Sequence, residues 1–204
     1  MTANPHARLE AFCDGVFAIA LTLLIIDLKA PSTANLRTSR DLWLALAVLL
    51  PSVFAFLLSF GIVFITWVNH HEAMKLVDKS SIPFIYANGF LLLTVVIIPF
   101  PTALLGDNLL TDHASPAVVL YSATYAMQAV GWWLVTRAAL RPEPLTRNAR
   151  GAAKTRQSHR DSYLAFAFYT TCAIGAAWFP LTIAVVITLS WIVWLIYGIT
   201  LKEE

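Results

Sequence analysis

The stretch Arg8-Leu-Glu-Ala-Phe-Cys-Asp-Gly-Val-Phe-Ala-Ile-Ala-Leu-Thr-Leu-Leu-Ile-Ile-Asp27 decides the fold class of this chain. From residue 16 to residue 26 it is apolar except for Thr22, which is the pattern of a helix that enters a membrane. A polar cluster nevertheless stands at its start, and a hydroxyl lies near its middle. Polar and ionisable groups are costly in lipid, so these residues are candidates for function.

The composition of the whole chain also indicates a membrane protein. Of 204 residues, 58% are hydrophobic and 13% are charged, and the mean hydropathy is +0.69; soluble domains carry about 25% charged residues. The apolar runs are long and continuous, unlike the short alternating strands of a barrel. We therefore predict an all-α integral membrane protein. Cys13 and Cys172 lie in or beside apolar runs, without the spacing of a disulfide framework or a metal site.

A helix needs about 20 mostly apolar residues to cross a bilayer, and we predict six such spans in a single domain over 1–204. The expected spans are 11–28, 42–68, 82–105, 116–136, 162–178 and 181–201. Pro51 lies inside the second span, and Pro99 and Pro101 are expected to bend or end the third. Residues 178–180 form the short turn between the last two.

Positive charges favour the cytoplasmic side of a membrane protein. With the N-terminus inside, eleven Lys and Arg residues fall on the cytoplasmic side and three (Lys29, Arg37 and Arg40) on the outer side. An even number of spans then places both termini in the cytoplasm of a multi-pass protein of the cell membrane. The basic loop 141–160 is interpreted as an orientation signal that lies against anionic lipid headgroups, and not as a nucleic-acid site.

This topology brings two polar groups to the cytoplasmic level of the bilayer. Asp14 stands near the entrance of the first span, and the second span ends in Trp67-Val-Asn-His-His-Glu72. A carboxylate near a helix start is also favourable against the helix dipole, so a purely structural role stays open. Adjacent histidines point about 100° apart on a helix, and the other histidines lie at no useful spacing. We expect no metal site and no cofactor.

Thr22 has two interpretations. A threonine in a transmembrane helix usually donates a hydrogen bond to the backbone carbonyl four residues earlier. On a helical wheel, however, Thr22 shares one face with Ile19, Leu23 and Ile26. Because the helix is apolar all round, this stripe does not by itself indicate a function.

The residues Arg8-x-x-x-Phe12-Cys13-Asp14-Gly15 resemble the R-x-x-x-F-S-D-G motif on the first helix of the transmembrane-protein-175 family of potassium channels. The stretch Trp67-x-x-His70-His71 is similar to the second-helix motif of that family. The length and the expected spans resemble its prokaryotic members, which carry one six-helix repeat. Cys13 stands where the family usually has serine, and a thiol is a weaker hydrogen-bonding group than a hydroxyl.

The resemblance implies a homotetramer in which the first helix of each chain lines a central pore for K⁺ and other monovalent cations. Like the family, this chain lacks a glycine-rich carbonyl filter. The family's apolar constriction corresponds to Ile19 and its pore hydroxyl to Thr22, and two further pore-facing positions correspond to Leu23 and Ile26. Structural support of the inner mouth is assigned by the resemblance to Arg8, Phe12, Cys13, Asp14, Gly15, Trp67, Asn69, His70 and His71.

The function that the resemblance implies is passive, moderately potassium-selective conduction through a hydrophobic constriction. Ions must shed part of their water there, and K⁺ holds its hydration shell less tightly than Na⁺. The alternative is a proton-coupled small-ion transporter, with Asp14 and His70 or His71 relaying protons. A membrane-embedded enzyme is a third possibility, but clustered carboxylates, histidines and nucleophiles are scarce. We expect no enzymatic activity.

Overall fold

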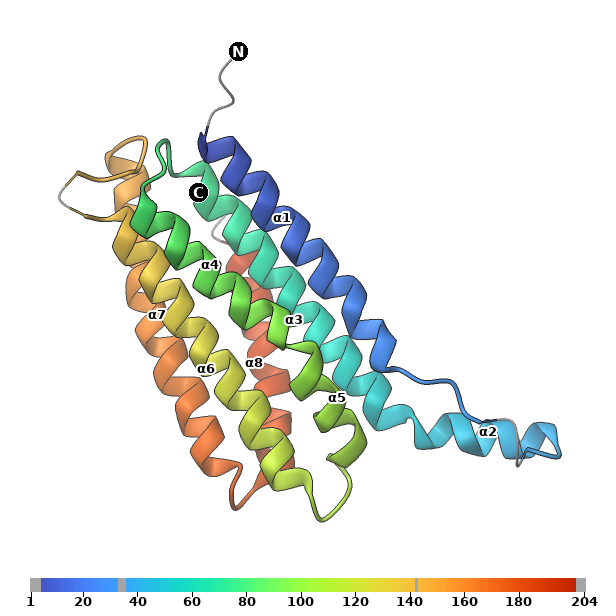
Figure 1. Ribbon diagram of the computed structural model, residues 1–204. Coiled ribbons are helices and arrows are strands. Elements are labelled where there is room, and N and C mark those ends of the chain that lie inside the picture. Colours follow the sequence, from blue (N-terminus) through green and yellow to red (C-terminus); the bar gives the residue numbers. More distant parts are fainter. Residues whose placement is uncertain (1–4, 33–35, 142, 201–204) are drawn as a thin grey trace.

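The computed structural model describes residues 5–32, 36–141 and 143–200, and it is helical along most of that length (Figure 1). The elements in chain order are α1 (Pro5–Leu23), the 3-10 helix η1 (Leu24–Asp27), α2 (Ser39–Val48), α3 (Leu50–Lys75), α4 (Ile82–Ile97), α5 (Pro99–Asn108), α6 (Ala114–Ala139), α7 (Ala149–Gly175) and α8 (Pro180–Thr200). All of them except α2 run along the long axis of one bundle, and α1 begins at the end of the bundle towards which α8 runs (Figure 1).

Four stretches of the described chain are long and apolar enough to cross a membrane: His6–Asp27, Leu50–Lys75, Ile82–Asn108 and Ala114–Ala139. Pro180–Val193 is a shorter apolar helix. The chain is therefore an all-helical membrane protein, as its composition predicts, whereas the count of six spans stays a prediction.

The expected span 42–68 does not form one helix. α2 ends at Val48, and α3 begins at Leu50 and continues to Lys75. The break follows from Pro51, which lies in the first turn of α3, where its missing N–H is not needed. α2 has its own start, because Thr38 and Asp41 form a reciprocal capping box. Figure 1 shows α2 projecting sideways from the bundle, and none of its residues is buried.

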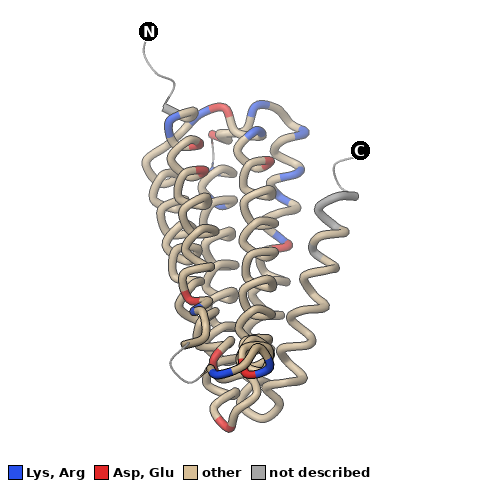
Figure 2. Tube along the Cα trace, turned by 90° about the vertical axis from the view of Figure 1, so that its right-hand side faces the viewer, with Lys and Arg blue, Asp and Glu red and all other residues tan. Residues whose placement is uncertain are grey.

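Other elements also differ from the expected spans, and α1 itself begins at Pro5, before the expected start at residue 11. α4 ends at Ile97 and α5 continues from Pro99 to Asn108, three residues beyond the expected end. α7 begins at Ala149, so most of the expected basic loop 141–160 is helical. Asn148 caps α7, since its side chain accepts a hydrogen bond from the Gly151 amide at 2.8 Å. Figure 2 shows Lys and Arg gathered at the end of the bundle where α1 begins and along this part of α7, with a smaller mixed-charge group at the opposite end.

The interior of the bundle is organised around α6, which packs against α4, α5, α7 and α8. A buried hydroxyl network joins three helices there: Ser59 Oγ of α3 lies 2.7 Å from Thr102 Oγ1 of α5 and 2.9 Å from Tyr121 Oη of α6. Tyr125 Oη donates to Tyr121 Oη at 3.3 Å. Unpaired hydroxyls are costly away from water, so this network fixes how α3, α5 and α6 pack.

Candidate functional site

α1 has two faces with opposite environments. The face that packs against α3 and α4 consists of Cys13, Phe17 and Ala20, which are at most 1% exposed, and Leu24 of η1 continues it. The opposite face, called the outer face below, is exposed and consists of Phe12, Gly15, Ile19 and Thr22 of α1 and Ile26 of η1. Both sets follow the spacing of three and four residues that one helix face requires. The packing face thus holds α1 against α3 and α4, whereas the chain leaves the outer face uncovered.

The residues predicted to line a pore lie mainly on this outer face. Ile19 is 59% exposed and Ile26 is 65% exposed, and Thr22 lies between them. Leu23 is half-buried and lies at the edge of the face. Ile26 belongs to η1, whose tighter turn of about three residues changes its direction relative to an α-helical wheel.

The Thr22 hydroxyl donates to the Ile19 carbonyl oxygen at 2.8 Å, three residues earlier and not four. Its proton is therefore used within the helix, while its oxygen keeps lone pairs that can accept or coordinate.

Gly15 also lies on the outer face, one turn before Ile19. A Cβ atom placed at Gly15 would meet nothing within 4 Å. Packing inside the chain therefore does not require glycine at this position, although glycine in a helix interior costs about 1 kcal/mol relative to alanine.

A polar network, called the α1–α3 network below, joins the start of α1 to the end of α3. Trp67 Nε1 donates to Asp14 Oδ1 at 2.9 Å. The Trp67 ring stacks on the His71 ring with centroids 5.8 Å apart, and His71 Nδ1 lies 3.6 Å from Glu10 Oε1. The sequence prediction placed Asp14 and the end of the second span at the same level of the bilayer, and the contacts join them through Trp67 and His71 and not through Asn69 or His70. That prediction missed Glu10, which the four-residue spacing from Asp14 places on the same helix face.

His70 belongs to a separate, buried contact, although it is adjacent to His71. It is 1% exposed, and its Nε2 lies 2.8 Å from Asn88 Oδ1 of α4. Asn88 Nδ2 donates to the Phe84 carbonyl, which leaves Oδ1 as the acceptor and assigns the proton to Nε2 of His70. The ring also contacts Phe17 of α1 with centroids 5.4 Å apart. His70 therefore connects α3 to α4 and supports the buried face of α1.

The remaining residues assigned to the inner mouth do not join the α1–α3 network within the chain. Arg8 and Phe12 are exposed, and no ion pair of Arg8 occurs among the described residues. Cys13 is fully buried in the packing face of α1. Asn69 is exposed and lines a cavity on the other side of α3.

One group of carboxylate and imidazole side chains has the atoms that can bind a divalent cation, and it consists of Glu10, Asp14 and His71. Their nearest ligand atoms all lie within 4.8 Å of one another, and no second group of this kind occurs in the part of the chain that is described. The sequence-based expectation of no metal site considered the histidines and did not include Glu10. Asp14 and Glu10 already have protein contacts that hold α1 to α3. The expectation that the chain has no metal site stays a prediction.

Comparison with known proteins identifies relatives of this arrangement. A family model described as the endosomal/lysosomal potassium channel TMEM175 matches residues 8–99. A potassium channel of Chamaesiphon minutus is 43% identical over 123 residues, which is 60% of each chain. A potassium channel of Streptomyces collinus is 39% identical over 140 residues, which is 66% of each chain. The matched segments thus span 60% and 66% of the length of these two relatives.

A solved structure extends the likeness to nearly the whole fold. The crystal structure of a lysosomal potassium-selective channel TMEM175 homolog from Chamaesiphon minutus superimposes with a TM-score of 0.79 at 30% sequence identity. The match covers 95% of this chain and 97% of that one.

Proposed function

Because this chain belongs to the TMEM175 family, we propose that copies of it assemble as a homotetramer that conducts K⁺ passively through a central pore. α1 of each copy lines the pore. The channel spans the cell membrane six times per chain, and both termini are cytoplasmic. The clustering of Lys and Arg at the end of the bundle where α1 begins supports this orientation (Figure 2).

The outer face of α1 is the observation that carries this proposal. The span that contains α1 is the least buried of the four candidate spans. In its apolar 18-residue stretch 28% is buried, compared with 56% in the corresponding stretch of α6. Contact with lipid would account for Ile19 and Ile26, but it gives no reason for a glycine and a threonine on the same stripe. Close approach of the α1 helices from several copies accounts for Gly15, because small residues let helix backbones meet.

The chemistry of conduction then follows from the order of residues along the outer face. Ile19 follows Gly15 by one turn, and a ring of Ile19 side chains forms an apolar constriction that can empty of water. A cation that passes it must shed part of its hydration shell, which costs more for Na⁺ than for K⁺. The Thr22 oxygens offer ligands directly beyond the constriction, and Leu23 and Ile26 continue the lining.

The α1–α3 network supports this pore without touching the ion. Trp67 and His71 hold the start of α1 through Asp14 and Glu10, and His70 packs on Phe17 one turn further along. A helix held at successive turns cannot rotate, so the outer face keeps its direction towards the pore axis.

Recording from purified protein in planar bilayers, with K⁺ on one side and Na⁺ on the other, tests the proposed function. Discrete currents that reverse towards the K⁺ potential are expected. Ion uptake into vesicles that occurs only under a proton gradient, with no current in bilayers, would replace the channel by the proton-coupled transporter.

Ile19→Asn tests the constriction. Asparagine wets the ring, so conductance should rise and the K⁺-to-Na⁺ permeability ratio should fall severalfold. Ile174→Asn on α7 is the matched control, because Ile174 is 60% exposed and Ile19 is 59% exposed. An unchanged permeability ratio in Ile19→Asn would remove this residue from the filter.

A further inference from the structure

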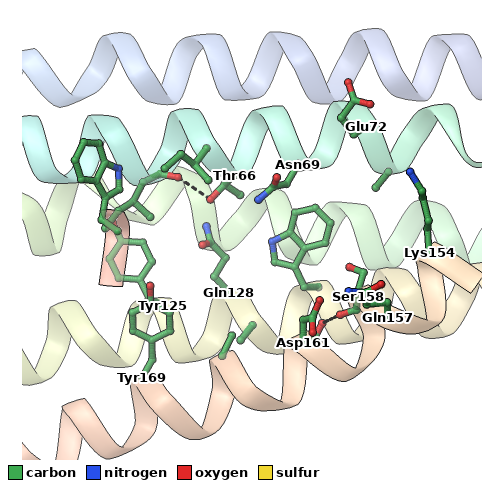
Figure 3. Close-up of a pocket in the computed structure, with 18 of the residues that line it drawn as sticks. Thr66, Asn69, Glu72, Tyr125, Gln128, Lys154, Gln157, Ser158, Asp161 and Tyr169 are labelled. Carbon is green, nitrogen blue, oxygen red and sulfur yellow. Dashed lines mark hydrogen bonds between the residues drawn. The ribbon is translucent and has the colours of Figure 1, made fainter. Parts of the chain in front are cut away.

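A cavity of about 480 Å³ lies between α3, α6, α7 and α8, and it is partly open to the outside (Figure 3). In Figure 3, α3 lies between the cavity and α1, so the cavity is separate from the outer face of α1. Figure 2 shows α8 diverging from the other helices towards the end of the bundle where α1 begins. Nothing in the channel proposal uses this cavity.

The cavity is long and narrow. Its lining runs along α3 from Ile62 to Leu76 and along α7 from Lys154 to Tyr169. At 1.5 Å per residue, the helix from Lys154 to Tyr169 measures about 22 Å. One leaflet of a bilayer, with half of the hydrocarbon core and one headgroup layer, is about 20–22 Å deep. Because the candidate span of α3 ends at Lys75, the cavity runs from the headgroup level to about the middle of the bilayer.

The lining changes from charged to apolar along this length. Glu72 of α3 and Lys154 of α7 stand at the outer end, near the membrane surface. The inner end is mainly apolar and aromatic, and its lining includes Ile62, Ile65, Ala129, Tyr125, Tyr169 and Trp191. Charged groups at the surface and apolar groups towards the bilayer centre follow the order of a phospholipid molecule. The long, narrow shape suits an extended acyl chain better than a compact solute.

Two polar side chains of the cavity are accessible to an occupant. Lys154 is exposed, and its ammonium group has no ion pair or hydrogen bond in the part of the chain that is described. Figure 3 shows Lys154 extending from α7 towards α3. Asn69 is exposed as well, and its amide has no hydrogen-bond partner among the described residues. A phosphate can pair with Lys154, and ester carbonyl oxygens can accept from Asn69.

The charged side chains of the cavity are of both signs, which selects among headgroups. Glu72 and Asp161 place two carboxylates beside the single ammonium group of Lys154. Anionic lipids are held by clusters of Lys and Arg, so this lining disfavours them. Glu72 pairs with Lys75 at 3.0 Å and its side chain is 43% exposed, and a carboxylate has acceptor sites for a second ammonium group. The lining therefore matches a zwitterionic headgroup.

We propose that this cavity binds a membrane phospholipid whose headgroup carries a phosphate and a primary ammonium group, as in phosphatidylethanolamine. The phosphate pairs with Lys154, and the ammonium group donates to Glu72. One acyl chain fills the apolar inner end between α3 and α7. The bilayer that surrounds the chain supplies this occupant, so the site needs no soluble ligand.

Native mass spectrometry of the full chain in detergent tests the occupant with dioleoyl phosphatidylethanolamine, phosphatidylcholine and phosphatidylglycerol. Phosphatidylethanolamine should be retained saturably, at one molecule per chain, and about tenfold more tightly than the other two. Phosphatidylcholine lacks ammonium N–H donors and phosphatidylglycerol lacks the cation, and one charge-assisted hydrogen bond provides a difference of this size. Equal retention of the three lipids would overturn the proposal.

Glycerophosphoethanolamine separates a lipid site from a site for a soluble molecule, because it has the same headgroup and no acyl chains. We expect no measurable binding of this compound, since the apolar inner end of the cavity contributes nothing to its affinity. Retention as tight as that of phosphatidylethanolamine would assign the cavity to a soluble molecule and overturn the proposal.

Lys154→Gln should weaken the retention of phosphatidylethanolamine and phosphatidylcholine alike, about tenfold, because both carry the phosphate. Glu72→Gln should instead remove the preference for phosphatidylethanolamine over phosphatidylcholine. Arg156→Gln is the control, because Arg156 is also exposed on α7 and does not line the cavity. Unaltered retention in Lys154→Gln, or the same loss in Arg156→Gln, would overturn the assignment. None of these measurements depends on ion conduction, so they can fail while the proposed function stands, and the reverse.

Discussion

α1 and α6 are both apolar helices that can cross a membrane, yet their polar and small residues have opposite explanations. In α6, Ser122, Thr124 and Thr136 donate to carbonyls four residues earlier at 2.8–2.9 Å. Gly131 has its reason inside the chain as well, because a Cβ atom there would lie 3.0 Å from Leu91 Cα of α4. Ser122, Thr124, Thr136 and Gly131 of α6 are thus accounted for by contacts within the protomer.

On α1 the same residue types face outwards. Gly15 has open space beside it, and Thr22 is exposed even though its proton is bonded within the helix. The chain holds α1 by one face and by the α1–α3 network, and it leaves the other face uncovered. The difference shows that α6 serves the interior of one protomer, whereas the outer face of α1 is left uncovered by the chain, as the proposed homotetramer requires.

The sharpest test of this difference is the pair Gly131→Val and Gly15→Val. Valine at 131 must push against the backbone of α4, so we expect a loss of about 1–3 kcal/mol in the free energy of unfolding. Valine at 15 has room within the chain, so the protomer should stay folded while the proposed homotetramer dissociates. Thermal unfolding followed by tryptophan fluorescence measures the first effect, and light scattering in detergent measures the second. A stable tetramer with Gly15→Val would contradict the assignment of the outer face to a helix–helix interface.

Trp67→Phe should have the next largest effect, because it leaves the Asp14 carboxylate without its indole donor. A hydrogen bond to a charged group contributes about 1.5–3 kcal/mol, and the partial exposure of Asp14 places the expected loss at the lower end. The readout is faster thiol labelling of Cys13, which is fully buried on the packing face of α1, in a Cys172→Ala background. Trp133→Phe is the control, since the Trp133 indole donates to the exposed Tyr163 hydroxyl at 2.7 Å. Equal labelling rates in the two variants would mean that Asp14 does not hold α1.

Much of this arrangement could be predicted from the sequence, because long apolar runs indicate membrane helices. The all-helical class and the family are confirmed, and the helix break at Pro99 was expected from proline chemistry. The start of α7 at Ala149 was missed, since its first half is charged and shows no apolar run. The separation of α2 from α3 was also missed, because a proline within an apolar run marks a break no more clearly than a kink.

The candidate site was harder to predict than the fold. A helical wheel groups Ile19 and Thr22, but it does not say that this face is the one the chain leaves open. Glu10 was missed because its partner, His71, lies on a different helix.

Thr22→Val sharpens the comparison at the level of single oxygens. It removes the hydroxyl ligands proposed beyond the constriction and keeps the volume of the side chain. The K⁺-to-Na⁺ permeability ratio should therefore fall by less than in Ile19→Asn. We expect a fall of about two- to threefold, because a ligand that replaces water contributes on the order of 0.5 kcal/mol. Thr171→Val on α7 is the control, because Thr171 is also exposed and also donates to a backbone carbonyl at 2.8 Å. A fall of the same size in both variants would assign the effect to the fold and not to the ion path.

The smallest effect is expected at His159, which attaches α7 to α6. Its Nδ1 lies 2.8 Å from Thr136 Oγ1, and its ring stacks on Trp133, over which the Arg137 guanidinium lies. Burial, and then the charge of Arg137, lower the pKa of His159. The unfolded chain therefore binds the proton more readily, so this contribution to stability is complete above the ordinary histidine pKa and is lost as the pH falls below it.

His159→Gln should thus flatten the decrease in unfolding temperature between about pH 7.5 and about pH 5.5, the range in which histidine titrates. Because this contact lies between α6 and α7, the variant should leave the oligomeric state and the permeability ratio unchanged. A change in the oligomeric state or in the permeability ratio would show that the α6–α7 contact is coupled to α1. The interior of the protomer and the outer face of α1 could then not be treated as separate.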